Sequence, residues 1–258
     1  MKIMSLNIWG GKEFDSLICF ISKMRDDIDV FCFQEMVFGH SPVFSRKLKI
    51  RENIFSELTS ILFDFDSFEY RAAKGSFIGG EKLNSMTDVG QAIFVRKSII
   101  VKKSGGFRTY DLNGSIAKDV GQTITGNFQF VILDINGKEV SIGNLHGLWQ
   151  GGTEKKDTPE RIYQSEKMME FINSRNGYKI LLGDFNVRPD TECIKILDRR
   201  LKNLIVENKI DSTRSRLYTK PIKFSDYVFI SPDLPVNDFT VLEDVVSDHL
   251  PLLLDVSI

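Results

Sequence analysis

Residues 178–186 read Tyr-Lys-Ile-Leu-Leu-Gly-Asp-Phe-Asn, an apolar run that ends in a carboxylate and a carboxamide two positions apart. A short continuous apolar run of this kind is typical of a strand buried on both faces. Period-two geometry would aim Asp184 and Asn186 from the same face of that strand. A proton acceptor beside a neutral hydrogen-bond donor suits hydrolysis of a phosphate ester. The alternative interpretation is an Asx turn that caps the next helix.

Strands and helices are expected to alternate on both sides of this run. Further strands are predicted from alternating or continuous apolar runs at 2–8, 29–34, 91–96, 98–103, 123–134, 139–145, 225–231 and 250–257. Asn136-Gly137 between two of them predicts a hairpin turn with positive φ at both positions. Helical spacing appears at 14–24, again from Ile50 to Ile61, and after the capping triplet Thr158-Pro159-Glu160. Strands interleaved with helices predict an α/β fold with mixed sheets.

Polar residues stand where several of these strands end or are interrupted. Glu35 ends the second strand, and His146 ends a strand between small residues. Asp248 and His249 directly precede the C-terminal strand, and Asn7 interrupts the first. A buried carboxylate requires a cation or a strong donor, and magnesium suits a site with few protein carboxylates. Taken singly, each residue is equally compatible with an ordinary turn or helix start.

Composition excludes several classes of protein. The 258 residues carry a net charge of −1, so no basic excess points to strong nonspecific nucleic-acid binding. The three cysteines, Cys19, Cys32 and Cys193, lie in or beside apolar runs and are expected to be buried, reduced thiols. His40 lies in a loop without polar neighbours of interest and is expected to have no role. With no signal peptide and no apolar stretch long enough for a membrane span, we expect a soluble, cytoplasmic, single-domain protein (residues 1–258) without an obligate protein partner.

Together, and in this order, these motifs resemble the endonuclease/exonuclease/phosphatase superfamily. Its members include DNase I-like nucleases, abasic-site endonucleases, neutral sphingomyelinases, inositol-polyphosphate 5-phosphatases and tyrosyl-DNA phosphodiesterase 2. The resemblance runs from Asn7 to His249, and Leu-Gly-Asp-Phe-Asn followed by Ser-Asp-His-Leu-Pro is its most specific part. It implies a four-layer α/β/β/α sandwich of two mixed sheets. It also implies a hydrolase that uses Mg²⁺ or Mn²⁺.

The resemblance also implies roles for the matching metal-side positions. Glu35 would be the principal metal ligand, with Asn7 and Asp248 close to the metal or its waters. Asp184 would orient or deprotonate the attacking water.

On the substrate side, Asn186, His146 and His249 would contact the phosphate ester. His146 would lie near the leaving group, and Asp226 would pair with His249. Arg161 and Gln164 match a helix start that supports the site without touching substrate.

Some departures from the family bear on the substrate. Abasic-site endonucleases carry a tryptophan before the Asp-Tyr strand, whereas residues 213–218 here read Thr-Arg-Ser-Arg-Leu-Tyr. Asn7-Ile8-Trp9-Gly10 is closer to sphingomyelinase-like and small bacterial members, and Trp149 could stack on a base or sugar. We therefore expect hydrolysis of a phosphodiester, in nucleic acid or a small molecule. The alternatives are a phosphomonoesterase acting on a sugar, inositol or nucleotide phosphate, a sphingomyelinase-like phosphodiesterase and, least expected, a non-catalytic binding module.

Overall fold

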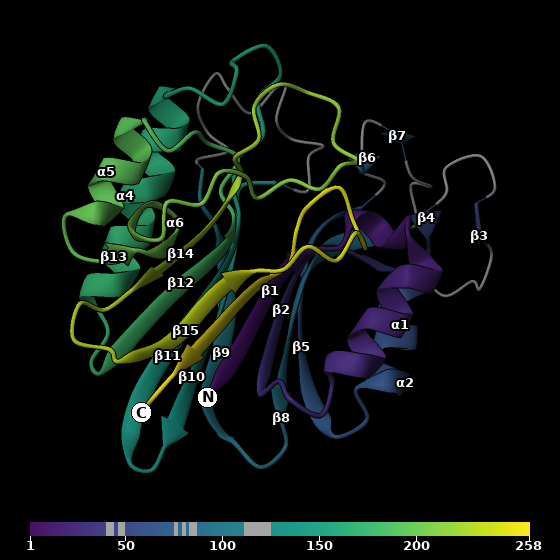
Figure 1. The fold of residues 1–258 in the computed structure, drawn as a ribbon, viewed down its shortest axis with the longest axis horizontal. Coiled ribbons are helices and arrows are strands. Elements are labelled where there is room, and N and C mark those ends of the chain that lie inside the picture. The colour runs from purple at the N-terminus through teal and green to yellow at the C-terminus, as the bar shows by residue number, and fades with distance from the viewer. Residues whose placement is uncertain (40–43, 46–49, 75–76, 79–80, 83–86, 111–124) are drawn as a thin grey trace.

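Two six-stranded sheets lie face to face, with helices on the outer side of each (Figure 1). The computed structural model describes residues 1–39, 44–45, 50–74, 77–78, 81–82, 87–110 and 125–258. Helices α1 and α2 cover one sheet, and α4, α5 and α6 cover the other (Figure 1). The predicted sandwich of two mixed sheets is confirmed.

The first sheet has the strand order β15-β16-β1-β2-β8-β5. Its strands are β1 (Lys2–Asn7), β2 (Val30–Phe38), β5 (Phe65–Lys74), β8 (Asp88–Arg96), β15 (Val236–Val241) and β16 (Leu252–Val256). β1 and β2 are parallel, because α1 (Phe14–Met24) crosses over between them, and the other neighbours are antiparallel. Helix α2 (Ile54–Ile61) follows the two-residue strand β4 (Ile50–Arg51), which pairs with β3 (Phe44–Ser45).

The second sheet has the order β13-β14-β12-β11-β10-β9. Its strands are β9 (Ile100–Arg108), β10 (Asn127–Ile135), β11 (Lys138–His146), β12 (Tyr178–Asp184), β13 (Lys202–Asn203) and β14 (Asp226–Ile230). β11 and β12 are parallel and are joined by α4 (Pro159–Asn173). The remaining elements are η1 (Trp9–Gly11), β6 (Phe77–Ile78), β7 (Glu81–Lys82), α5 (Glu192–Asp198) and α6 (Leu204–Glu207).

Several local predictions can be compared directly with the structure. Asn136 and Gly137 have φ angles of 54° and 81°, as the hairpin signal requires. Thr158 caps α4, and its side chain accepts a hydrogen bond from the Arg161 backbone N–H. Two expectations are wrong: Ile50 belongs to β4 rather than to a helix, and Cys19 is exposed because the apolar face of α1 turns the other way. His40 lies outside the described residues.

The layers are held by apolar clusters on both faces of the first sheet. Alternation along β2 places Phe31 and Phe33 against α1 and α2, whereas Val30 and Cys32 face the second sheet. All four side chains are fully buried. Burial of a large apolar side chain contributes about 1.5–3 kcal/mol, so these strands anchor the sandwich.

Near one end of the strands the space between the sheets becomes polar. Gln34 donates to Asn144 Oδ1 of the opposite sheet at 2.7 Å and to Ser5 Oγ at 3.2 Å. Asn144 in turn donates to the Phe33 carbonyl at 3.1 Å, and Gln91 donates to the Asn144 carbonyl at 2.8 Å. Hydrogen bonds between buried groups have fixed partners, so this layer sets the alignment of the two sheets.

None of the helices in the described part of the chain is long and apolar enough to cross a membrane.

Candidate active site

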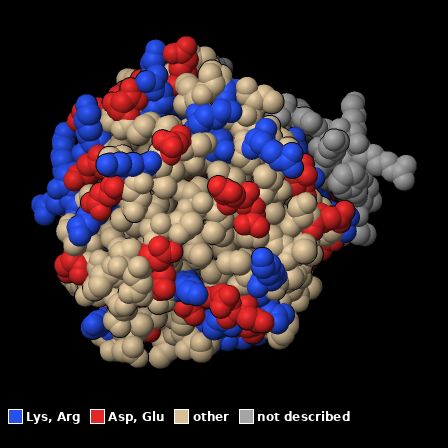
Figure 2. Space-filling view, in the orientation of Figure 1, with Lys and Arg blue, Asp and Glu red and all other residues tan. Residues whose placement is uncertain are grey.

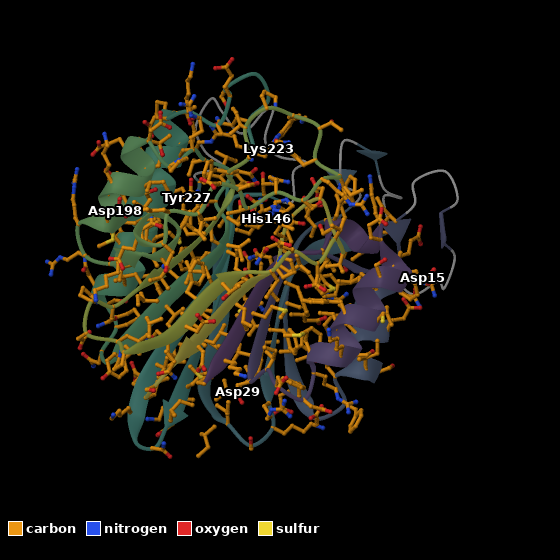
Figure 3. The ribbon with its side chains drawn as sticks, viewed as in Figure 1. Asp15, Asp29, His146, Asp198, Lys223 and Tyr227 are labelled. Atoms are coloured by element: carbon orange, nitrogen blue, oxygen red, sulfur yellow. The ribbon has the colours of Figure 1, made fainter. Side chains whose placement is uncertain are left out.

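The residues that the sequence predicted for the site meet at the end of the sandwich beyond the polar layer. In the second sheet, His146 is in register with Asp184 of the parallel strand β12. Asp184 is opposite Asp226 of β14, and in the first sheet Asn7 is in register with the residue before Glu35. Figure 3 shows His146 at the opposite end of the sheets from Asp29. Both sheets therefore contribute to one polar cluster.

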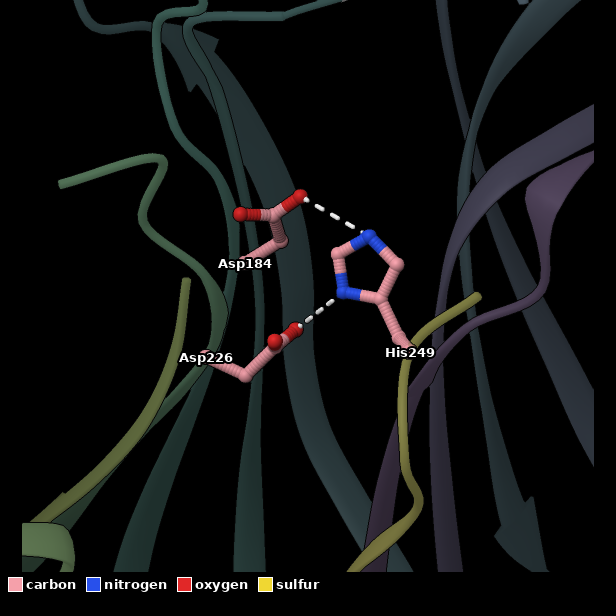
Figure 4. Close-up of side chains that lie close together, drawn as sticks. All are labelled: Asp184, Asp226 and His249. Atoms are coloured by element: carbon pink, nitrogen blue, oxygen red, sulfur yellow. Dashed lines mark hydrogen bonds and ion pairs between the residues drawn. The ribbon is translucent and has the colours of Figure 1, made fainter. Parts of the chain in front are cut away.

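His249 lies between two aspartates, as Figure 4 shows. Its Nδ1 is 2.8 Å from Asp226 Oδ1, and its Nε2 is 3.6 Å from Asp184 Oδ2. The other oxygen of Asp226 accepts a hydrogen bond from Thr213 Oγ1 at 2.8 Å. These ligand-type atoms are close enough to surround a cation. However, the Nδ1–Asp226 hydrogen bond already occupies one side of the ring, so the group is better described as an oriented imidazole.

The charge on His249 follows from its surroundings. Burial and the nearby Arg214 guanidinium lower the pKa of His249, but Asp226, Asp248 and Asp184 together raise it above its usual value. The ring is therefore suited to carry a proton and to donate it through Nε2.

Asp184 is held by donors on both of its oxygens. Asn7 Nδ2 donates to Oδ2 at 3.2 Å, and Ser225 Oγ donates to Oδ1 at 2.5 Å. Burial opposes ionisation of Asp184, but His249, Arg214 and further cations outweigh it and hold the pKa of this carboxyl well below its usual range. Asp184 therefore stays ionised and acts as a hydrogen-bond acceptor.

Asn186 is arranged differently from the predicted strand geometry. β12 ends at Asp184, and Asn186 has a φ of 55° with its backbone N–H donating to Asp184 Oδ1 at 2.9 Å. This is the Asx turn that was the alternative interpretation, although the next helix starts only at Glu192, so no cap is formed. Asn186 Nδ2 donates to the Gly147 carbonyl at 3.0 Å. A contact with phosphate by the second amide hydrogen stays a prediction.

Glu35 lies in a β-bulge, where the backbone departs from regular strand geometry. The register of β2 against β8 shifts between Gln34 and Met36, and Glu35 has a φ of 56° within this bulge. Its Oε2 is buried and has no hydrogen-bond partner in the described part of the chain. Burial, followed by the charge of Asp248, raises the pKa of Glu35 to about 7.

The two carboxylate oxygens of Asp248 differ in their contacts. Its Oδ2 accepts a hydrogen bond from Arg214 Nη1 at 2.9 Å, whereas its Oδ1 is buried without a hydrogen-bond partner among the described residues. Asp248 Oδ1 and Glu35 Oε2 offer two carboxylate oxygens. Asn7 Oδ1, which accepts the Trp9 N–H at 3.0 Å, could add a carboxamide oxygen, which makes an all-oxygen donor set. This set fits a hard divalent cation such as Mg²⁺.

His146 is almost completely buried, with 1% of its surface exposed. Its Nε2 lies 3.8 Å from Glu35 Oε1 and 4.0 Å from Asp184 Oδ2, and its Nδ1 has no partner in the described structure. Burial lowers its pKa to about 4, so the ring is neutral at pH 7. A neutral imidazole can donate a hydrogen bond but is a poor source of a proton.

Two buried cations beside the site were not predicted from the sequence. Arg214 bridges the cluster, because its Nη2 donates to Ser225 Oγ at 2.9 Å while Nη1 contacts Asp248. Lys155 is 9% exposed, and its ammonium donates to the Phe224 carbonyl at 2.8 Å. Neither residue stands at the end of a strand, which is the signal that identified the other positions.

Arg161 and Gln164 support the segment that follows His146. The buried Arg161 donates to the Leu148 carbonyl at 3.2 Å, and Gln164 Oε1 accepts the Leu148 N–H at 2.9 Å. Their positions agree with a supporting role, since both side chains are bonded to protein groups.

Residues 4–249 of the chain match the sequence model of the Endonuclease/Exonuclease/phosphatase family. The chain belongs to this family. Members of the endonuclease/exonuclease/phosphatase family are usually phosphoesterases and commonly use divalent metals. No curated protein sequence matches the chain at a significant level.

Solved structures of the family share the fold. A family protein from Leptotrichia buccalis has a TM-score of 0.71 and 18% identity, with both chains covered completely. A mannosyl-6-phosphatase from Bacteroides thetaiotaomicron has a TM-score of 0.67 and 17% identity, again over 100% of each chain. The human Nocturnin catalytic domain with bound sulfate has a TM-score of 0.67 and 19% identity over 100% of this chain and 93% of that one.

Proposed function

We propose that this protein is a magnesium-dependent phosphoesterase, with residues 1–258 acting as one domain. The observation that carries the proposal is a pair of buried oxygens, Glu35 Oε2 and Asp248 Oδ1, that have no hydrogen-bond partner among the described residues and lie beside the Asp184–His249–Asp226 arrangement. Leaving buried carboxylate oxygens without a partner is costly, and a divalent cation removes that cost.

In this proposal Glu35 and Asp248 hold the metal, and Asn7 lies close to it. The bound metal would supply a Lewis acid that neutralises charge on the phosphate. Mn²⁺ is expected to replace Mg²⁺, because both prefer oxygen ligands.

The remaining residues act on the water and the phosphate. Asp184 stays ionised and accepts a hydrogen bond from the attacking water, which fixes its direction of approach. His249, oriented by Asp226, donates from Nε2 to a phosphoryl oxygen as negative charge builds there. Asn186 and the neutral His146 complete the contacts, with His146 on the leaving-group side.

Two substrate classes remain in competition within the proposal. Hydrolysis of a phosphodiester, in nucleic acid or a small molecule, is the first, and hydrolysis of a sugar, inositol or nucleotide monophosphate is the second. The fold shared with a mannosyl-6-phosphatase supports hydrolysis of a phosphomonoester as the second class. On the face shown in Figure 2, basic and acidic residues are intermixed, so this face offers no continuous basic track for a long duplex. Trp149, which follows His146 by three residues and is 51% exposed, offers a stacking surface for a base or sugar. The cytoplasmic location stays a prediction.

Hydrolysis of a panel of phosphodiesters and phosphomonoesters, measured with Mg²⁺ and after exhaustive chelation, tests the proposal. We expect turnover of one class, loss of activity with EDTA, and recovery when Mg²⁺ or Mn²⁺ is returned. Full turnover after chelation would contradict metal dependence. An absence of turnover on both panels with metal would favour the non-catalytic alternative.

A further inference from the structure

Lys155 is buried by an unusual local turn between β11 and α4. Glu154 and Lys155 have φ angles of 50° and 58°, although neither is glycine. The flanking side chains stay outside, where Lys156 pairs with Glu154 at 2.8 Å. Non-glycine residues in this backbone region are strained and persist where the surroundings require them. The turn directs one lysine of the pair inward and leaves the other in solvent.

The buried ammonium is incompletely satisfied. A lysine ammonium has three donors, and the Phe224 carbonyl takes one of them. The described residues provide no other hydrogen-bond acceptor and no ion pair for it. Phe224, whose carbonyl it contacts, directly precedes Ser225, which donates to Asp184 Oδ1, so the ammonium lies beside the catalytic cluster. Burial and the charge of Arg214 lower the pKa of Lys155 to about 8, against the opposing charges of nearby aspartates, so the side chain is mostly protonated at pH 7.

The neighbouring cations show that Lys155 differs from Arg214. Both lie over the ring of Tyr218, with Arg214 Cζ at 4.2 Å and Lys155 Nζ at 5.5 Å from its centre. Lys223 Nζ lies 5.4 Å from the same centre, and Figure 3 shows Lys223 at the same end of the sheets as His146. Arg214 is paired with Asp248, whereas no carboxylate of the described residues pairs with Lys155.

We propose that Lys155 is a substrate-binding residue whose ammonium takes a non-bridging oxygen of the substrate phosphate. The inference rests on the proposed function and adds a selectivity to it. A phosphomonoester carries two negative charges at neutral pH and a phosphodiester one. The contribution of Lys155 therefore grows with the charge of the phosphate, and it favours dianionic substrates.

The test compares Lys155→Met with Lys156→Met, a neighbouring lysine that is 62% exposed and has no place in the site. Binding of inorganic phosphate to the Mg²⁺-loaded protein is measured by titration calorimetry. Hydrogen bonds to charged groups lead us to expect about 10- to 100-fold weaker binding for Lys155→Met and no change for Lys156→Met. On p-nitrophenyl phosphate KM should rise by a larger factor than on bis(p-nitrophenyl) phosphate.

Equal phosphate affinity in the two variants would overturn the proposal. So would a fall in kcat and melting temperature with phosphate affinity unchanged, because Lys155 would then only hold the Phe224 carbonyl. If Lys155→Met does not fold, Lys155→Gln retains a donor for that carbonyl and removes the charge, and the same two outcomes decide. Failure of the wild-type protein to hydrolyse any ester defeats the proposed function separately, since phosphate binding is measured without turnover.

Discussion

The surroundings of His249 and those of His146 differ in how completely they are bonded. Around His249, the carboxylates of Asp184 and Asp226 and the guanidinium of Arg214 all have partners at hydrogen-bond distance. Around His146, the ring Nδ1 and Glu35 Oε2 are buried without hydrogen-bond partners among the described residues, and the ring Nε2 lies 3.8 Å from Glu35 Oε1. The first region is already organised by protein groups. In the proposed function, metal and substrate would supply the missing partners in the second.

Asp184→Asn, in the hydrogen-bonded region around His249, is expected to have the largest effect on kcat. Loss of the ionised acceptor should lower kcat by about 10²–10⁴-fold, the usual contribution of a positioned acid or base. Asp190→Asn is the control, because Asp190 is 63% exposed and pairs with Arg188 at the surface. Rates should be compared alongside melting curves. An unchanged rate in a folded Asp184→Asn protein would remove Asp184 from the water-orienting role.

Arg214→Met should lower the free energy of unfolding, because it removes a partner in the same region around His249. The Arg214–Asp248 pair is buried, and removal of one partner of such a pair costs about 3–5 kcal/mol. Arg216→Met, at an exposed position two residues away, should stay within about 0.5 kcal/mol of wild type. Urea unfolding of the metal-free proteins measures both. Matching stabilities for the two variants would show that Arg214 does not organise the site.

In the region around His146, Glu35→Gln should weaken Mg²⁺ binding on the order of 10–100-fold. Raised Mg²⁺ should partly restore its activity but not that of His249→Ala, because His249 acts on the phosphate. In the metal-free wild type the pKa of Glu35 is about 7, so a proton competes with the ion below that pH. Mg²⁺ affinity should therefore rise as pH increases through 7, and this dependence should weaken in Glu35→Gln. Identical metal responses of the two variants would contradict the division of roles.

His146→Ala should have the smallest and most selective effect. Because its pKa is about 4, the ring acts at neutral pH as a hydrogen-bond donor rather than an acid. We expect about tenfold greater loss on an alkyl phosphate ester than on a nitrophenyl ester, whose leaving oxygen requires little help. Steady-state kinetics on the two esters measure the ratio. Equal losses would mean that His146 supports the site without assisting departure.

The sequence predicted the strand-end residues because strand ends are visible in a single chain. An apolar run that stops at a carboxylate identifies Asp184, which does end its strand. The same signal selected Glu35, but the expectation that Glu35 ends its strand is wrong, because β2 continues through a bulge to Phe38. Arg214 and Lys155 gave no such signal, since their importance comes from burial against residues distant in sequence. The strands β5 and β15 and the short helix α5 were also missed, because their positions depend on tertiary packing more than on local periodicity. The roles of the site residues remain predictions.

The bulge at Glu35 affects which residues are favoured at this position during evolution. A glutamate with a φ of 56° is disfavoured relative to glycine or asparagine at the same place. Its carboxylate is also buried with one oxygen unpartnered in the described structure, so both backbone and side chain destabilise the metal-free fold. Random substitution under selection for folding alone would replace such a residue, because replacement increases stability. A glutamate at position 35 is therefore expected if the proposed cation site is in use, and replacement of this residue is expected where the site is not.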